Sequence, residues 1–318
     1  MKIKDIGGEF ELIKRITGKA VNDKNVIKGI GDDCAVIYNG NKYLLVTTDM
    51  MVENDHFNLK WQTPQQVGMK LMEANVSDIV SMGGKPTYAF ISMSLTKETS
   101  VELIEGIYEG LHISAKIHKV IILGGDTTHG TEHVFNLTLL GEVDKSLVKY
   151  RSCAREGDII CVTGKLGGST AGLKLLLNNK DGYLLDHLEP KSRLASEGEI
   201  ISRYANSMID VSDGLGSEVR HICEESNVGA RIDYDKIPLS DETIKSAEIV
   251  GENPEDFALY GGEDFELVFT IPQNKINFLK KEFNEFSIVG EILDSNKGFF
   301  ILKNNKKVVP KSGYNHFG

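Results

Sequence analysis

The sequence predicts a mixed α/β protein with two domains, and three observations support this prediction. The chain has 318 residues, more than the roughly 100 to 200 of a typical domain. With 41% hydrophobic and 26% charged residues, it has the composition of a protein that buries a core. Strand-like apolar runs alternate with stretches of helical spacing on both sides of a polar segment at 144–158. We therefore expect an N-terminal domain over 1–148 and a C-terminal domain over 149–318.

The N-terminal half contains strands and helices in turn. Apolar residues at helical spacing predict helices over 8–16, 64–82 and 100–116. Runs rich in β-branched and aromatic residues predict strands over 42–48, 88–95, 120–123 and 133–143.

The same two signals recur in the C-terminal half. They predict strands over 159–163, 207–211, 230–234, 265–271, 288–293 and 299–302, and helices over 171–177, 215–226 and 275–283.

Aspartates recur beside glycines or hydroxyl residues, at points where predicted elements end. They are Asp33, Asp49, Asp78, Asp126, Asp210 and Asp213. Each alone fits ordinary turn chemistry, and Ser212 or Asp213 would cap the helix that follows. Together they offer the oxygen donors that Mg²⁺ shares with phosphates, and Thr47 and Thr48 could add hydroxyl or carbonyl oxygens. The nearby glycines would let a polyphosphate approach the backbone.

Charge and composition exclude several classes of protein. A net charge of −10 argues against a broad nucleic-acid surface, although bridging metal ions can still bring phosphates to an acidic protein. The four cysteines form neither a CxxC pair nor a zinc-finger pattern, which favours reduced thiols. The N-terminus lacks an apolar signal core, and no run approaches the roughly 18 apolar residues of a membrane span. We expect a cytoplasmic protein with no membrane or nucleic-acid partner.

The common nucleotide-binding signatures are missing. There is no P-loop, no complete dinucleotide-binding glycine motif and no protein-kinase motif pair. A glycine-rich stretch at 164–169 could bind phosphate at a helix N-terminus, but we interpret it as a structural turn. If the chain binds ATP, it must use another arrangement.

The motifs taken together resemble those of one family. They include Gly-Ile-Gly-Asp-Asp at 29–33, Thr-Thr-Asp at 47–49, Asn-Val-Ser-Asp at 75–78, Gly-Gly-Asp-Thr at 124–127, Asp-Val-Ser-Asp-Gly at 210–214, Gly-Gly-Glu-Asp-Phe at 261–265 and Gly-Tyr-Asn-His-Phe at 313–317. In this order they resemble thiamine-monophosphate kinases, nearly end to end. That family belongs to the ATP-binding superfamily of aminoimidazole ribonucleotide synthetase and selenophosphate synthetase.

The resemblance implies an aminoimidazole ribonucleotide synthetase-like fold. Its N-terminal domain would bind ATP and Mg²⁺ and pair with its twin in a homodimer, with ATP close to the subunit interface, and its C-terminal α/β domain would complete the substrate site. The implied reaction converts thiamine monophosphate to thiamine diphosphate with ATP, in the last step of thiamine diphosphate biosynthesis. Two alternatives remain open: another ATP-using enzyme of the superfamily, and a non-catalytic Mg-nucleotide sensor.

The resemblance also assigns roles to residues. The implied metal ligands are Asp33, Thr47, Thr48, Asp49, Asp78, Asp126, Asp210 and Asp213. The implied ATP contacts are Tyr108, Gly125, Asp126, Arg151 and Ser212, and the implied contacts to the thiamine substrate are His56, Glu263 and Tyr314. Without the resemblance, Arg151 could equally be a solvated linker charge, Tyr314 a packing residue and His56 a surface histidine.

Two segments depart from the family pattern. Asn54 and Asp55 precede His56 where a glycine is expected, and Tyr-Arg-Ser-Cys at 150–153 replaces Thr-Arg-Ser-Gly. The chemistry of the expected reaction is less affected by these changes.

A phosphate monoester acceptor is already largely ionised, with a second pKa of about 6, so no general base is required. We therefore assign no nucleophile or base and expect direct in-line transfer, with the aspartates as metal holders.

Overall fold

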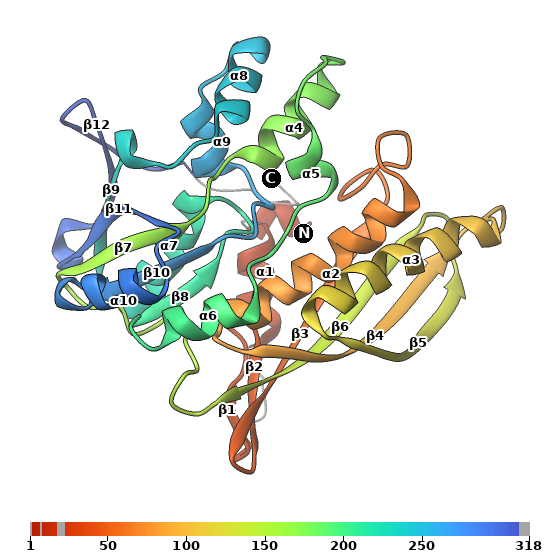
Figure 1. The fold of residues 1–318 in the computed structure, drawn as a ribbon, viewed down its shortest axis with the longest axis horizontal. Coiled ribbons are helices and arrows are strands. Elements are labelled where there is room, and N and C mark those ends of the chain that lie inside the picture. The colour runs from red at the N-terminus through yellow and green to blue at the C-terminus, as the bar shows by residue number, and fades with distance from the viewer. Residues whose placement is uncertain (1, 7, 18–22, 312–318) are drawn as a thin grey trace.

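The computed structural model describes residues 2–6, 8–17 and 23–311 of the chain. It confirms the predicted mixed α/β class, because helices pack against two separate mixed sheets (Figure 1). The first sheet has six strands and lies within the N-terminal half of the chain, and the second has seven strands and lies within the C-terminal half. No helix in the described part of the chain combines the length and apolar composition that a bilayer crossing requires.

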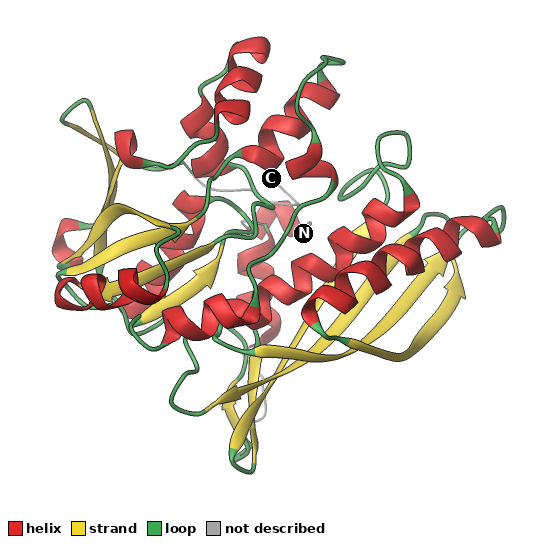
Figure 2. Ribbon diagram, viewed as in Figure 1, coloured by secondary structure: helices red, strands yellow, loops and turns green. Residues whose placement is uncertain are grey.

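The first sheet has the order β1-β2-β3-β6-β4-β5. Its strands are β1 (Val26–Lys28), β2 (Ala35–Asn39), β3 (Lys42–Val52), β4 (Lys85–Leu95), β5 (Ile121–His129) and β6 (Val134–Asp144). Neighbours pair antiparallel except β4 and β5, which run parallel. The N-terminal segment adds the 3-10 turn η1 (Ile3–Ile6) and α1 (Glu9–Thr17). Helices α2 (Pro64–Ser81) and α3 (Val101–His118) cover one face of this sheet, and Figure 2 shows no described helix on the other.

The start of α2 follows from its sequence. Thr63 and Gln66 form a capping box, and Pro64 occupies the first helical turn, where its missing N–H costs nothing. The next helix packs very closely against it. A Cβ on Gly68 of α2 would lie 2.0 Å from the carbonyl oxygen of Ile107 in α3, so only glycine permits this approach. The close packing of the two helices fixes the position of α2 above the sheet.

The second sheet has the order β13-β12-β9-β11-β7-β10-β8. Its strands are β7 (Asp158–Thr163), β8 (Ser207–Asp210), β9 (Gly229–Asp233), β10 (Leu267–Pro272), β11 (Phe286–Leu293), β12 (Phe299–Lys303) and β13 (Lys306–Val308). The remaining helices are α4 (Gly168–Leu177), α5 (Leu185–Leu188), α6 (Ala195–Ser202), α7 (Leu215–Ser226), α8 (Asp241–Val250), α9 (Pro254–Tyr260) and α10 (Ile276–Glu282). Short 3-10 turns η2 (Tyr234–Lys236), η3 (Gln273–Lys275) and η4 (Ser295–Lys297) complete this half.

One apolar core crosses between the two halves. It contains Leu45 and Ile79 from the first half together with Met208 and Phe269 from the second, all fully buried. Helix α2 contacts β3 and β6 on one side and β8 and α6 on the other, and Figure 1 shows it between the two sheets. The two halves therefore stabilise each other. A domain boundary at 148/149 would lie between β6 and β7 and stays a prediction.

Two strands extend past their predicted ends. β3 continues to Val52 because it pairs with β6 over its full length, and β5 continues to His129 beside β4. The glycines of β5 do not end the strand, since a Cβ on Gly125 would lie 1.6 Å from the Ile91 carbonyl oxygen of β4. The expectation that Asp49 and Asp126 follow the ends of strands is therefore wrong, because both lie inside strands.

Candidate functional site

Three aspartates from distant parts of the chain meet between the two sheets. Asp33 precedes β2, Asp78 lies in the last turn of α2, and Asp210 ends β8. One carboxylate oxygen of each lies within 4.8 Å of the others. We call these three residues the aspartate cluster. It joins side chains from both halves of the molecule, so it exists only when the two halves pack together.

Hydroxyl groups hold the aspartate cluster in place. Thr47 Oγ1 donates to Asp78 Oδ2 at 2.5 Å, and Ser77 Oγ donates to Asp210 Oδ2 at 2.7 Å. Ser81 Oγ donates to Asp33 Oδ2. Ser77, Asp78 and Ser81 all come from α2, whose buried face is unusually polar. The helix thus supplies one carboxylate and orients the two others.

Asp49 lies next to this cluster. Residues 47 and 49 pair across the sheet with the fully buried Leu139 and the buried Leu137, so their side chains share the helix-covered face. The Asp49 N–H donates to Asn75 Oδ1 of α2 at 3.2 Å. Burial and the nearby Asp33 carboxylate raise the pKa of Asp49 to about 6. This interaction places Asp49 within the electrostatic field of the cluster.

The aspartate cluster carries more negative charge than the protein offsets. Burial and the charge of Asp33 raise the pKa of Asp210 to about 8, and burial with the charge of Asp49 raises that of Asp78 well above its usual value. Arg151 is paired with Asp33, with Nε and Nη2 at 2.9 and 2.5 Å from Oδ1. The donors are all oxygen atoms, mostly carboxylate, as a hard cation such as Mg²⁺ requires. The residues therefore fit a divalent cation.

Thr48 and Asp126 lie outside this cluster. Thr48 Oγ1 is exposed on the uncovered face of the sheet, where it hydrogen-bonds Thr138 Oγ1 at 3.1 Å. Asp126 is exposed on the edge strand β5. Three strand spacings, roughly 14 Å, separate β5 from β3. Within one chain, neither side chain joins the aspartate cluster, and their roles as metal ligands stay predictions.

Two loops place further predicted residues beside Asp210. Glu263 N–H donates to the Ser212 carbonyl at 2.9 Å, which ties the 261–266 loop to the 211–214 loop. The Asp213 N–H donates to Oε1 of the fully buried Glu218 side chain at 2.8 Å. The N-cap of α7 is Gly214, so the expectation that Ser212 or Asp213 caps this helix is wrong. Predicted metal, ATP and substrate residues therefore converge here.

A buried lysine joins the predicted substrate residues. Lys70 Nζ of α2 lies 2.7 Å from Glu263 Oε2 and 2.8 Å from the His56 carbonyl oxygen. The side chain of Lys70 is 2% exposed, whereas that of Glu263 is 31% exposed. The Lys70 ammonium group thus donates to His56 in the first half of the chain and to Glu263 in the second half. Tyr314 lies outside the described residues.

The remaining predicted ATP residues have more ordinary surroundings. Tyr108 on α3 is half-buried against the core, with its ring centroid 6.3 Å from that of His112. Position 125 requires glycine because β4 approaches it closely, and this packing reason is independent of any contact with ATP. In the glycine-rich stretch at 164–169, the N–H groups of Gly167 and Ser169 donate to the Asp264 carboxylate, at 2.7 and 3.3 Å. This contact supports its interpretation as a structural turn.

Both departures from the family pattern fall at unusual backbone conformations. Asn54 has φ 67° and Cys153 has φ 115°. These values lie in the left-handed region that favours glycine, and asparagine tolerates it better than cysteine does. Cys153 directly follows the Arg151 segment, so backbone strain lies beside a predicted ATP contact.

Comparisons with known proteins match this arrangement. Family models described as AIR synthase related protein, N-terminal domain and C-terminal domain, match residues 31–143 and 155–303. The thiamine-monophosphate kinase of Aquifex aeolicus (strain VF5) is 36% identical over 326 residues and covers 100% of both chains. The chain belongs to the thiamine-monophosphate kinase family.

Two further relatives support this assignment. The thiamine-monophosphate kinase of Bacillus subtilis (strain 168) is 34% identical over 328 residues, covering 97% of this chain and 99% of the relative. A solved structure of AaThiL complexed with AMPPCP and TMP superimposes with a TM-score of 0.87 at 35% identity, covering 99% of each chain. The predicted family and the predicted two-domain fold are confirmed, and the chain is a kinase.

Sequence reasoning missed several residues of this thiamine-monophosphate kinase family member. Lys70 lies three residues after Val67 and one before Leu71, on the apolar stripe of α2. A lysine on a buried stripe is a signal that could have been noticed, because it needs an anionic partner. Ser77 and Ser81 share the helical face of Asp78, whereas nothing in the sequence distinguishes Glu218 from a surface glutamate.

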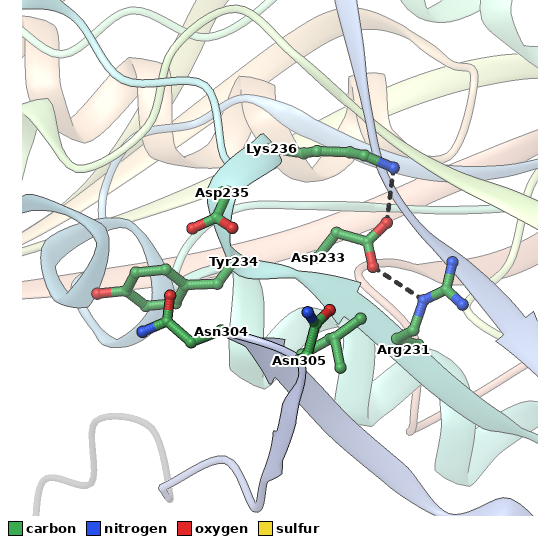
Figure 3. Close-up of a pocket in the computed structure, with 8 residues that line it drawn as sticks. Arg231, Asp233, Tyr234, Asp235, Lys236, Asn304 and Asn305 are labelled. Atoms are coloured by element: carbon green, nitrogen blue, oxygen red, sulfur yellow. Dashed lines mark hydrogen bonds and ion pairs between the residues drawn. The ribbon is translucent and has the colours of Figure 1, made fainter.

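A surface hollow of the kinase lies away from these residues. It has a volume of about 320 Å³ and lies beside β9 and the turn between β12 and β13 (Figure 3). Asp233 bridges Arg231 and Lys236 along its wall, at 2.8 and 2.7 Å. The hollow is lined by none of the predicted site residues. The candidate site is therefore the region between the two sheets.

Proposed function

We propose that this chain transfers the γ-phosphoryl group of ATP to thiamine monophosphate and so forms thiamine diphosphate. The observation that carries this proposal is the convergence of the aspartate cluster with the loop of Glu263, from both halves of a chain of this family. Phosphoryl transfer depends mainly on positioning and on charge neutralisation. An oxygen-lined acidic site would hold Mg²⁺, which would supply the charge neutralisation, and the adjoining loop of Glu263 would help to position the acceptor.

The acceptor decides which side chains are needed. A phosphate monoester ionises with a second pKa of about 6, so its attacking oxygen is already free of a proton at neutral pH. No residue has to act as a general base, and none of the aspartates is assigned that role. The aspartates would instead hold the cations that orient the phosphates, and the ionised acceptor permits direct, in-line transfer.

We propose that Asp33, Asp49, Asp78 and Asp210 hold Mg²⁺, with Asp213 from the adjoining loop. Bound Mg²⁺ would supply charge neutralisation for the phosphates. Arg151 forms an ion pair with Asp33. We propose that it also contacts an ATP phosphate, since a guanidinium pairs well with phosphate oxygens. Ser212 lies in the same loop as Asp213 and can contribute a hydrogen bond to ATP.

The thiamine half of the substrate would contact Glu263 and His56. Both residues accept a hydrogen bond from Lys70, and the Glu263 side chain remains partly exposed. Tyr314 is proposed as a third contact from the family motif, because an aromatic face attracts the thiazolium cation. Glu263 and His56 would form the acceptor side of the site, and the loop of Glu263 is hydrogen-bonded to the loop of Ser212.

We also propose that two copies form a dimer through the uncovered face of the first sheet. Tyr88 and Phe90 of β4 are 44% and 41% exposed on that face, and Ile121 and Leu123 of β5 are exposed at its edge. A long apolar edge strand and an apolar sheet face are liabilities in a monomer and require a partner. Asp126 lies on β5, so its predicted contact to ATP would occur near this interface. A Phe90→Glu variant that stays dimeric in analytical ultracentrifugation would exclude this interface.

We place the reaction in the cytoplasm. The four cysteines, Cys34, Cys153, Cys161 and Cys223, are free thiols, and three of them are buried. Free thiols are typical of a reducing compartment. An active enzyme recovered with oxidised, paired cysteines would contradict this placement.

A product assay tests the proposed function. The protein is incubated with Mg·ATP and thiamine monophosphate, and thiamine diphosphate is measured by chromatography. Formation of thiamine diphosphate, with loss of turnover in Asp126→Asn, is the expected result. Normal ATP binding without product would favour a non-catalytic nucleotide sensor, and full turnover in Asp126→Asn would count against its assignment as a metal ligand.

A further inference from the structure

A lysine in the middle of α2 is buried where the two halves meet. The side chain of Lys70 is 2% exposed, and its ammonium group reaches two segments that are far apart in sequence. One is the carboxylate of Glu263, with Oε1 at 2.6 Å and Oε2 at 2.7 Å. The other is the main-chain carbonyl of His56 at 2.8 Å. One side chain therefore ties the loop after β3 to the loop before β10.

This arrangement is costly unless it serves a purpose. A buried ion pair contributes little net stability compared with apolar side chains of similar size, because both charges lose their hydration. The Glu263 backbone adds to the cost, since φ of 65° is unusual for a residue with a side chain. Such costs are typical of positions that hold functional groups.

The surroundings of Glu263 make Lys70 its main cationic partner. His187 Nδ1 lies 3.8 Å from Glu263 Oε2, but burial and the charge of Lys70 lower the pKa of His187 to about 4, so this ring is neutral at physiological pH. Ser169 Oγ lies 3.2 Å from His187 Nδ1 and helps to fix the ring. Lys70 thus offsets the charge of Glu263, while part of the carboxylate stays exposed.

We infer that Lys70 is a positioning residue for the thiamine monophosphate site. Its ammonium group holds Glu263 and the His56 loop in their binding geometry. The inference rests on the proposed contacts of Glu263 and His56 with the substrate. It also defines the role of Glu263. Because Lys70 already offsets its charge, Glu263 acts toward the substrate as a hydrogen-bond acceptor, not as the counter-ion of the thiazolium.

Steady-state kinetics of Lys70→Met, Glu263→Gln and a control, Lys174→Met, test this inference. Lys174 makes an exposed ion pair with Glu252 at 3.0 Å, so its loss should change neither KM. Lys70→Met is expected to raise KM for thiamine monophosphate about tenfold or more, and KM for ATP less than about twofold. Equal changes in both KM values, or a change in thermal stability alone, would reduce Lys70 to a structural tie and overturn the inference.

The comparison with Glu263→Gln separates the inference from the proposed function. If Glu263→Gln raises KM for thiamine monophosphate but Lys70→Met does not, the inference alone fails. If Glu263→Gln leaves that KM unchanged, the proposed substrate contact of Glu263 fails, and the inference fails with it.

A second variant covers the case in which Lys70→Met does not fold. The double variant Lys70→Met/Glu263→Gln removes both charges, so no unpaired buried charge remains. Its KM for thiamine monophosphate should exceed that of Glu263→Gln about threefold, because the His56 carbonyl loses its donor. Equal KM values for the two variants would overturn the inference.

Discussion

Replacing Asp210 by asparagine should stabilise the metal-free protein while it weakens metal binding. Asp210 is fully buried beside Asp33 and Asp78, and its pKa rises from 3.8 to about 8. The folded protein therefore binds this proton more tightly than the unfolded chain does, and at pH 7 the unfolded carboxyl has lost it. At about 1.4 kcal/mol per pKa unit, this difference in pKa lowers the free energy of unfolding of the metal-free protein by on the order of 4 kcal/mol at pH 7.

An asparagine at position 210 avoids this cost and keeps the bond from Ser77, because its amide oxygen still accepts. With an unfolding entropy of about 2 cal/mol/K per residue, 4 kcal/mol corresponds to a rise in Tm of roughly 6 °C for this chain. The assay is thermal unfolding followed by circular dichroism in EDTA at pH 7. Addition of Mg²⁺ should raise Tm of the wild type more than Tm of Asp210→Asn.

Asp158 provides a matched control. It is equally buried but accepts hydrogen bonds from Asn206 Nδ2 at 2.9 and 3.0 Å and from Arg155 N–H at 3.0 Å. An amide nitrogen at position 158 would face these donors, so Asp158→Asn should lower Tm. If Asp210→Asn lowers Tm in EDTA as Asp158→Asn does, the crowded carboxylates do not destabilise the metal-free fold.

The pKa values of Asp49 and Asp210 are raised from 3.8 to about 6 and about 8, so the folded protein holds these protons at pH values where the unfolded chain has lost them. The contribution of the two groups to metal-free stability should be greatest below the unfolded pKa and fall as pH rises from about 4 to about 8, while the gain in Tm from Mg²⁺ grows; a gain that is independent of pH would contradict the linkage. Cys153→Gly should raise the free energy of unfolding by about 1 kcal/mol, measured in urea, because glycine adopts φ of 115° without strain, whereas Cys153→Ser should not. Gly68→Ala should lower that free energy by about 3 kcal/mol, since its Cβ would lie 2.0 Å from a carbonyl oxygen of α3, while Gly29→Ala, with 3.9 Å to its nearest neighbour, should have little effect.

The sequence predicts single elements well where local pattern decides them. Helix α2 was expected over 64–82 and spans Pro64–Ser81, because its apolar stripe, Pro64 and the Thr63 cap all favour the same start. The ends of β3 and β5 depend on pairing with β6 and β4, which lie far away in the chain, and were predicted too short. Helices α8 and α9 were not predicted at all.

The candidate site was predicted as a set of residues but not as a geometry. The motifs identify Asp33, Asp78 and Asp210, yet their meeting depends on how the second half packs on α2, which no local spacing encodes. Thr48 belongs to the same motif as Asp49 but faces the opposite side of the sheet, as strand alternation requires once β3 is known to continue. Lys70 shows a further limit, since its partners lie 14 and 193 residues away in the sequence.

In the proposed reaction, the aspartate cluster holds the divalent cations that bring ATP to its acceptor. Electron paramagnetic resonance can measure the binding of Mn²⁺ to the cluster with an ATP analogue present. The wild type should bind Mn²⁺ at least about tenfold more tightly than Asp78→Asn or Asp210→Asn, because each variant replaces a charged carboxylate with a neutral amide. Equal Mn²⁺ affinity in all three proteins would place the metal elsewhere and contradict the claim.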